Sequence, residues 1–337
     1  MLGATEWVPK TRGQKGLRIL CFDGGGTRGV LTIAMLKRIM AEVGREPAQV
    51  FDIVVGTSTG AIVAALAGLE CFPLAQCEAM YDALIKDIFQ KSPSGGVKLA
   101  LKQAFYDEEN WMAILRSILG DKAMIDYADT PLAPKVAFPS TVISVNPSKL
   151  WLWRNYNYPT GHAGRYSGSY RHTVRESLRA TTAAPTFFSP LLINGTLYSD
   201  GALMANNPTA VALHEAKHIY PGVPVELVVS LGTGCFFEQA RDFSDPAVGW
   251  DGIVNQLISS ATETENTNDI MSDLVPAQQY FRFNPRMTDM AIDETRPERL
   301  AFLKELSDRY FEEPATRAQL DELRRPLQGQ HSNSIER

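Results

Sequence analysis

Largely apolar runs alternate along this chain with longer stretches in which hydrophobic residues recur every three or four positions. Three of the runs are Leu17–Phe22, residues 50–55 and Val225–Leu231. Such runs are typical of strands in a parallel sheet that is covered on both faces. After the first run, apolar residues at 30, 33, 36 and 39 predict a helix, and a second apolar helix is predicted from residue 61.

The same patterns continue to the end of the chain. They predict further helices over 74–89, 107–120, 173–180, from 207 onward and over 296–325, and further strands over 135–144, 149–156, 191–193, 196–198 and 279–283. A Pro/Gly/Ser-rich break is expected at 92–96. Strands that alternate with helices predict an α/β fold, a three-layer α/β/α sandwich with a mostly parallel central sheet.

The chain divides into three parts on these patterns. Residues 1–16 form an N-terminal extension, residues 17–310 one α/β domain, and residues 311–337 a C-terminal helix with a polar tail. A chain of 337 residues that is 45% hydrophobic can bury a core of that size. The sequence contains no internal repeat.

Net charge and cysteine content indicate which partners the protein can bind and in which compartment it works. The net charge of −5 argues against nucleic acid as a partner. Four scattered cysteines indicate reduced thiols in an intracellular protein. The longest uncharged apolar stretch, 61–69, is too short to span a bilayer, and residues 1–16 lack a hydrophobic signal core. We therefore expect an intracellular, cytoplasmic protein with peripheral membrane association. A mitochondrial or peroxisomal location is the alternative, although the sequence shows no signal for either.

A serine between two glycines is the first candidate for chemistry. Residues 56–60 read G-T-S-T-G, directly after an apolar run and before a predicted helix. In that context a serine sits on a tight turn with its hydroxyl exposed, which suits an acyl-transfer nucleophile. Ser58 is therefore the candidate nucleophile, with Thr59 beside it. The alternative is an ordinary strand-to-helix turn, which also favours glycine and serine.

Three consecutive glycines, Gly24, Gly25 and Gly26, follow the strand predicted at Leu17–Phe22 and precede a helix. Main-chain N–H groups at a helix N-terminus attract negative charge. Nucleotide-binding patterns do not fit, because no Lys-Ser/Thr follows and the spacing is D-G-G-G-x-R-G. The remaining hypotheses are a plain glycine turn and an oxyanion hole, and the second is favoured.

A serine nucleophile needs a base. None of the five histidines occupies the late position that an α/β-hydrolase triad uses. Asp200 ends a predicted strand and is followed by Gly201, which permits close approach to another element. Asp200 is therefore the candidate base, although an isolated aspartate of this kind is more often part of a simple turn.

These three motifs, in this order, resemble the patatin-like phospholipase family. The similarity extends over residues 17–299 and includes the segments 21–30, 55–62, 104–106, 179–185, 206–208, 229–234 and 280–285. The resemblance implies a Ser-Asp dyad of Ser58 and Asp200. It also implies an oxyanion hole made by the main-chain N–H groups of the three glycines. Arg28 would brace that loop or meet a lipid phosphate, and the alternative is a structural pair with a carboxylate. Ala202 stands where many relatives have glycine.

The family further implies the reaction. We expect a calcium-independent phospholipase that releases a fatty acid and a lysophospholipid from glycerophospholipids in a membrane or lipid aggregate. A lysophospholipase, a triacylglycerol lipase or a transacylase with the same dyad is the alternative. No cofactor and no metal are expected, and no acidic cluster has the spacing of a calcium loop.

Two further patterns compete with this interpretation. His214 to His218 read H-E-A-K-H, the pattern of a zinc peptidase, but without a convincing third ligand an exposed helix face is favoured. A histidine triad and a non-catalytic lipid-binding module also remain open. Aromatic residues at 151, 153, 156 and 158, and separately at 187 and 188, are candidates for acyl contact, although alternating tryptophans on a strand are more often core.

Overall fold

A computed structural model describes residues 6–88, 106–236, 262–288 and 290–328. Within these residues a nine-stranded sheet has the order β10-β8-β1-β2-β3-β4-β5, with β7 paired to β3 and β6 paired to β7. Neighbouring strands from β10 to β3 are parallel, whereas β4 and β7 both run antiparallel to β3. The strands are β1 (Leu17–Phe22), β2 (Ile53–Gly56), β3 (Lys135–Val142), β4 (Lys149–Arg154), β5 (Ser167–Ser169), β6 (Leu191–Ile193), β7 (Thr196–Asp200), β8 (Val225–Leu231) and β10 (Tyr280–Phe283), while β9 (Cys235–Phe236) and β11 (Arg286–Met287) form a separate pair.

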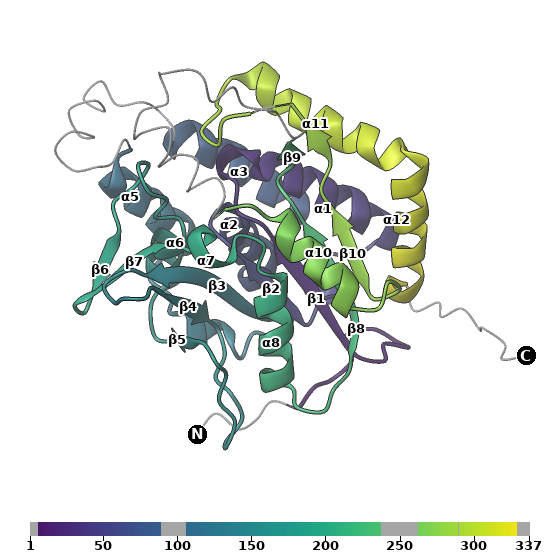
Figure 1. Cartoon of the computed structure of the whole chain (residues 1–337), viewed down its shortest axis with the longest axis horizontal. Helices are drawn as coiled ribbons and strands as arrows, with labels where there is room; N and C mark the ends of the chain where they lie inside the picture. The colour runs from purple at the N-terminus through teal and green to yellow at the C-terminus, as the bar shows by residue number, and fades with distance from the viewer. Residues whose placement is uncertain (1–5, 89–105, 237–261, 289, 329–337) are drawn as a thin grey trace, which may run out of the picture.

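Helices cover both faces of the sheet, as Figure 1 shows. Alternate residues of β1 enter two separate hydrophobic cores, because successive side chains of a strand point to opposite faces. Leu20 and Phe22 pack into the core that contains α1, α2, α3, α11 and α12, whereas Ile19 and Cys21 pack into the core beneath α8 and α10. The helices are α1 (Gly29–Val43), α2 (Thr59–Ala64), α3 (Leu74–Ile88), α5 (Glu108–Leu119), α6 (Val174–Thr181), α7 (Ala202–Ala205), α8 (Thr209–Ile219), α10 (Glu265–Leu274), α11 (Pro297–Glu312) and α12 (Pro314–Leu327). The predicted three-layer α/β/α sandwich is confirmed.

Strand β1 lies between β2 and β8, and the three strands end at the same level. Phe22 is paired with Gly56 of β2 and with Leu231 of β8. The chain builds outward from β1 through β2 and β3, and later returns to place β8 on the other side. Loops after neighbouring parallel strands meet at such a reversal, which is where open α/β sheets bind ligands. The glycine loop after β1 therefore lies between the turns that follow β2 and β8.

The C-terminal part differs from the single helix predicted over 296–325. It forms two helices, α11 and α12, because the chain is extended at Glu313 and Pro314 begins the second helix. Proline disfavours a helical conformation in the residue before it and suits the first turn of a helix. Helix α11 continues past residue 310, and both helices bury apolar side chains in the core next to α1.

Residues 6–16, expected as an extension, contact the domain. The Trp7 indole donates to Asp52 at 3.1 Å, and the Lys10 ammonium donates to the main-chain oxygen of Ala48 at 2.8 Å. The break expected at 92–96 lies outside the described residues. None of the helices in the described part of the chain combines the length and hydrophobicity that crossing a membrane requires.

Candidate active site

Ser58 occupies a sharp turn between β2 and α2. Its backbone has φ 52° and ψ −119°, a conformation that residues with a Cβ rarely adopt. A side chain on Gly60 would clash with the main chain at the end of β1, so strand and helix cross too closely for anything larger than glycine. Strain of this kind is concentrated at functional sites, where it presents one side chain in a fixed direction.

The structure brings Ser58 and Asp200 together from positions 142 residues apart in sequence. The Ser58 hydroxyl donates to Asp200 Oδ2 at 2.7 Å, and the main-chain N–H of Ala202 donates to Asp200 Oδ1 at 2.8 Å. Asp200 ends β7, which is held beside β3 by the pairing of Ser140 with Asp200. Each carboxylate oxygen is therefore fixed, and one of them faces the serine hydroxyl.

Burial sets the basicity of Asp200. The side chain is almost inaccessible, and burial raises its pKa to about 7, against the opposing effect of the hydrogen bonds from Ala202 and Ser58. A carboxylate surrounded by protein holds a proton more strongly than one in water, because its charge is poorly solvated. A pKa near neutrality suits a group that must accept and return a proton at physiological pH.

The three glycines differ in what their N–H groups can do. The N–H of Gly24 donates to Asn206, to the main-chain oxygen at 3.2 Å and to Oδ1 at 3.1 Å. The N–H groups of Gly25 and Gly26 have no hydrogen-bond partner among the described residues, and both glycines line the same pocket as Ser58. Two of the three expected donors therefore remain for a negatively charged oxygen. Gly24 instead allows close approach, since a Cβ there would lie 3.2 Å from Ser58 Cβ.

The three supporting residues expected from the sequence all contact this site or its framework. Arg28 Nε donates to the Gly25 carbonyl at 3.2 Å, and its guanidinium lies 5.0 Å from the centre of the Phe236 ring. Thr59 Oγ1 donates to the Gly26 carbonyl at 2.9 Å. A Cβ on Gly201 would overlap the main chain of β3. Only glycine therefore lets the chain directly after Asp200 lie this close to β3.

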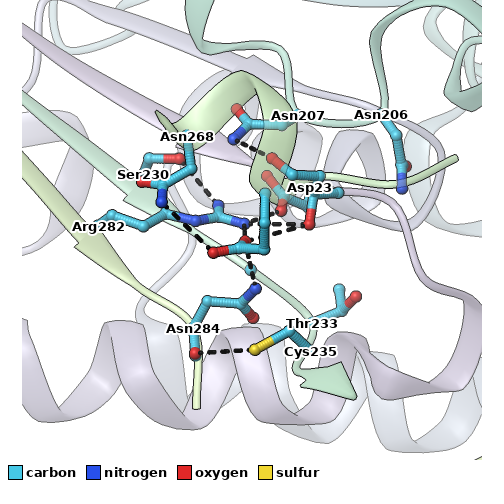
Figure 2. A network of polar contacts seen from close by, with 12 residues as sticks. Asp23, Asn206, Asn207, Ser230, Thr233, Cys235, Asn268, Arg282 and Asn284 are labelled. Atoms are coloured by element: carbon cyan, nitrogen blue, oxygen red, sulfur yellow. Dashed lines mark hydrogen bonds and ion pairs between the residues drawn. The ribbon is translucent and has the colours of Figure 1, made fainter. Parts of the chain in front are cut away.

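A buried charged network anchors the residue that precedes the glycines. Arg282 on β10 bonds Asp23 Oδ2 at 2.6 Å and Glu265 at 2.7 Å, and its other terminal nitrogen bonds Ser230 at 3.0 Å, as Figure 2 shows. Burial raises the pKa of Asp23, and the adjacent Arg282 guanidinium acts in the opposite direction because it stabilises the charged carboxylate. The network ties the start of the glycine loop to β8, β10 and α10.

Ser58 opens onto a largely apolar pocket that occupies about 990 Å³, part of it open to solvent. Phe187 and Phe188, one of the two aromatic groups considered for acyl contact, line this pocket. Trp151 and Trp153 do not, and Trp153 is fully buried in the core, with its indole bonded to Ser140 Oγ at 2.9 Å. The apolar lining residues are Ile62, Tyr81, Leu84, Ile85, Ile88, Trp111, Ala184, Pro185, Phe187, Phe188, Ala202, Leu203 and Ile292.

The H-E-x-x-H pattern lies on α8, away from the pocket. Glu215 is fully buried and accepts hydrogen bonds from the Tyr156 and Tyr158 hydroxyls at 2.7 and 2.8 Å. The expectation of an exposed helix face is therefore wrong for this residue, which anchors the segment after β4. His214 Nε2 accepts from the main-chain N–H of Arg165 at 2.9 Å. No histidine in the described part of the chain lines the pocket around Ser58.

Three contacts of the site were not predicted from sequence. The Tyr81 hydroxyl on α3 donates to the Gly26 carbonyl at 2.8 Å, and Thr181 Oγ1 on α6 accepts from the Ser58 N–H at 3.1 Å. Asn206 holds Gly24 as described above. Thr181 and Asn206 lie in segments that resemble the family, 179–185 and 206–208, but that resemblance does not indicate which atoms their side chains contact.

Comparisons with known proteins show which proteins this chain resembles. A family model described as patatin-like phospholipase matches residues 20–213. Calcium-independent phospholipase A2-gamma of Rattus norvegicus is 38% identical over 315 residues, which are 93% of this chain and 40% of that protein. Phospholipase A I of Arabidopsis thaliana is 30% identical over 349 residues, covering 86% of this chain and 26% of that protein. The solved structure of human GIVD cytosolic phospholipase A2 aligns with a TM-score of 0.48 and 12% identity, covering 94% of this chain and 61% of that one.

The family expected from the motifs is therefore confirmed. The chain spans about 40% of the length of the gamma enzymes that it matches. With more than half of its residues matched by the family model, the chain belongs to the patatin-like phospholipase family.

Proposed function

We propose that this chain is a lipid acyl hydrolase that cleaves fatty-acyl esters of glycerophospholipids without calcium. The observation that carries the proposal is the 2.7 Å hydrogen bond from Ser58, held in a strained turn, to the buried carboxylate of Asp200. The apolar pocket at this dyad suits an acyl chain. Relatives named calcium-independent phospholipase A2-gamma support the substrate class and the lack of a calcium requirement.

The dyad performs the first half of the reaction by moving one proton. Asp200 Oδ2 accepts the proton of the Ser58 hydroxyl as Ser58 Oγ attacks the ester carbonyl. The carbonyl oxygen becomes negative and is stabilised by the N–H groups of Gly25 and Gly26. As the tetrahedral intermediate collapses, the bond to the lysophospholipid oxygen breaks, and that oxygen takes the proton from Asp200. The acyl group is now bonded to Ser58.

The second half repeats these steps with water. Asp200 accepts a proton from water as the water oxygen attacks the acyl-serine carbonyl, and the same two N–H groups stabilise the second oxyanion. Collapse breaks the bond to Ser58 Oγ, which recovers its proton from Asp200. The free fatty acid leaves, and the dyad returns to its starting state. Apart from the attacking water, the groups that act on the substrate in this cycle belong to Ser58, Asp200, Gly25 and Gly26.

The substrate is embedded in a membrane or lipid aggregate, so we propose that the chain works at such a surface. A lysophospholipase, a triacylglycerol lipase or a transacylase would use the same dyad, and the pocket lining does not favour one of these over a phospholipase. The difference lies in which lipid enters the pocket and which acceptor takes the acyl group.

One incubation tests the proposal and separates these activities. A phosphatidylcholine with two different acyl chains is mixed with the protein and excess EDTA, and products are identified by mass spectrometry. Equal amounts of fatty acid and lysophosphatidylcholine are expected, and the chain released identifies the ester position. Ser58→Ala is the matched control and should give neither product. Failure of the wild-type protein to release fatty acid, or release by the serine variant, would refute the proposal.

A further inference from the structure

The geometry of the peptide unit links each oxyanion donor to the carbonyl of the residue before it. A trans peptide unit is planar, and its N–H and C=O point in opposite directions. The N–H of Gly25 therefore belongs to the same rigid plane as the carbonyl of Gly24. A hydrogen bond that fixes the direction of that carbonyl also fixes the direction of the Gly25 N–H.

Thr233 makes that bond. Its Oγ1 donates to the Gly24 carbonyl at 3.1 Å, and its side chain is buried. Thr233 follows β8, which lies directly beside β1, so the loop after β8 meets the glycine loop. A Cβ on Gly25 would overlap the Thr233 side chain, which places the Gly24–Gly25 peptide unit directly against it.

The loop that carries Thr233 is itself held in place. The N–H of Gly234 donates to Asn284 Oδ1 at 2.8 Å, and Asn284 Nδ2 donates to Glu265 at 2.8 Å. Glu265 is a partner of Arg282 in the charged network of Figure 2, which also draws Thr233, Cys235 and Asn284. The loop that carries the threonine hydroxyl is therefore hydrogen-bonded to this network.

Other side chains hold the neighbouring peptide units. Asn206 accepts the Gly24 N–H, and Arg28 donates to the Gly25 carbonyl from both its main-chain N–H and Nε. Tyr81 and Thr59 donate to the Gly26 carbonyl. Among the described residues, Thr233 is the group that bonds the Gly24 carbonyl. The unit that carries the Gly25 N–H thus depends on this one hydroxyl.

We propose that Thr233 is a positioning residue that aims the Gly25 N–H at the oxyanion. The inference deepens the proposed hydrolase function and rests on it. Thr233 does not touch substrate, and its effect passes through the Gly24–Gly25 peptide plane. Its loss should therefore slow the chemical step and leave substrate binding and the ionisation of Asp200 unchanged, because an oxyanion donor acts on the transition state.

Thr233→Val tests this with almost no change in side-chain size, and Thr233→Ser restores the hydroxyl. Turnover of a monomeric short-chain phosphatidylcholine is measured as kcat and KM across pH, with thermal unfolding measured alongside. We expect kcat of the valine variant to fall by about tenfold to a hundredfold. Misplacing an oxyanion donor lowers kcat by at most as much as removing it does. KM and the pH midpoint should stay at the wild-type values, and the serine variant should keep kcat within about threefold of wild type.

Thr316→Val is the control, because Thr316 is a buried threonine on α12, away from the pocket. It should keep the wild-type kcat. If the valine variant at 233 does not fold, Thr233→Ala is compared with Thr233→Ser, which both lack the methyl group and differ by the hydroxyl. The inference would be overturned if Thr233→Val and Thr233→Ser had equal kcat, or if Thr233→Ala and Thr233→Ser did. A shifted pH midpoint in the variant that lacks the hydroxyl would also overturn it. A wild-type protein without hydrolase activity would overturn the proposed function and this inference with it.

Discussion

The strained turn at Ser58 makes a measurable prediction about stability. Its φ of 52° and ψ of −119° lie where a residue with a Cβ incurs a steric cost of about 1–3 kcal/mol. Ser58→Gly removes the Cβ and therefore the strain, at a cost of about 0.4–1 kcal/mol from the greater freedom of glycine in the unfolded chain. Ser58→Ala keeps the Cβ. Both variants lose the hydrogen bond to Asp200, so that loss cancels when the two are compared.

The glycine variant should therefore exceed the alanine variant in free energy of unfolding by about 1 kcal/mol. Equilibrium unfolding in urea measures this difference, provided that the two variants have the same m-value. Neither variant should hydrolyse lipid. A glycine variant that is no more stable than the alanine variant would refute the claim that the fold stores strain at the nucleophile.

Further predictions concern charge and close packing. Activity should rise with pH through a midpoint near 7, because burial raises the pKa of Asp200 to about 7 and only its ionised form accepts a proton; an activity profile that is flat across neutrality would contradict this. Since this native pKa lies above the ordinary value of 3.8, the contribution of Asp200 to the free energy of unfolding should fall as pH rises from about 4 through 7, and Asp200→Asn should remove that contribution in urea titrations; an unchanged pH dependence in the variant would argue against it. Arg282→Leu should destabilise the fold by about 3–5 kcal/mol, because it leaves the Asp23 carboxylate buried without its partner, and a loss below about 1 kcal/mol would be inconsistent with the network described. Gly26→Ala should lower kcat by about a hundredfold or more, because its Cβ would overlap a neighbouring main-chain oxygen, whereas Gly44→Ala, also at positive φ but in open space, should keep wild-type kcat; equal kcat in the two variants would refute the packing argument.

The central part of the fold could be predicted because its signals are local. The apolar runs at β1 and β2 are each followed by glycines and a helical pattern within a few residues. Because β1 and β2 are parallel neighbours, the glycine turns that follow them lie at the same edge of the sheet. The serine turn was therefore expected from the sequence alone. Pro314 is also a local signal for the break between α11 and α12. The sequence nevertheless predicted one helix, because the helical pattern of charged residues continues on both sides of this proline.

The rest of the site depends on contacts between distant segments, which no local pattern specifies. Asn206 captures the Gly24 N–H across 182 residues, and this removes one of the three expected donors. Tyr81 is one of many aromatic residues in helical patterns, and only packing shows that its hydroxyl reaches the glycine loop. From sequence alone Glu215 is interpreted as a surface or metal-site residue, because the two tyrosines that donate hydrogen bonds to it lie far away in the chain.

The reaction of Ser58 with a fluorophosphonate lipid analogue tests the central claim most directly. Such a reagent bonds covalently to an activated serine, and peptide mass mapping identifies the residue that carries it. We predict a single adduct on Ser58, formed at least about a hundredfold more slowly in Asp200→Asn, because that variant lacks the base. An adduct on another residue, no adduct at all, or labelling of the asparagine variant at the wild-type rate would contradict a Ser58–Asp200 dyad.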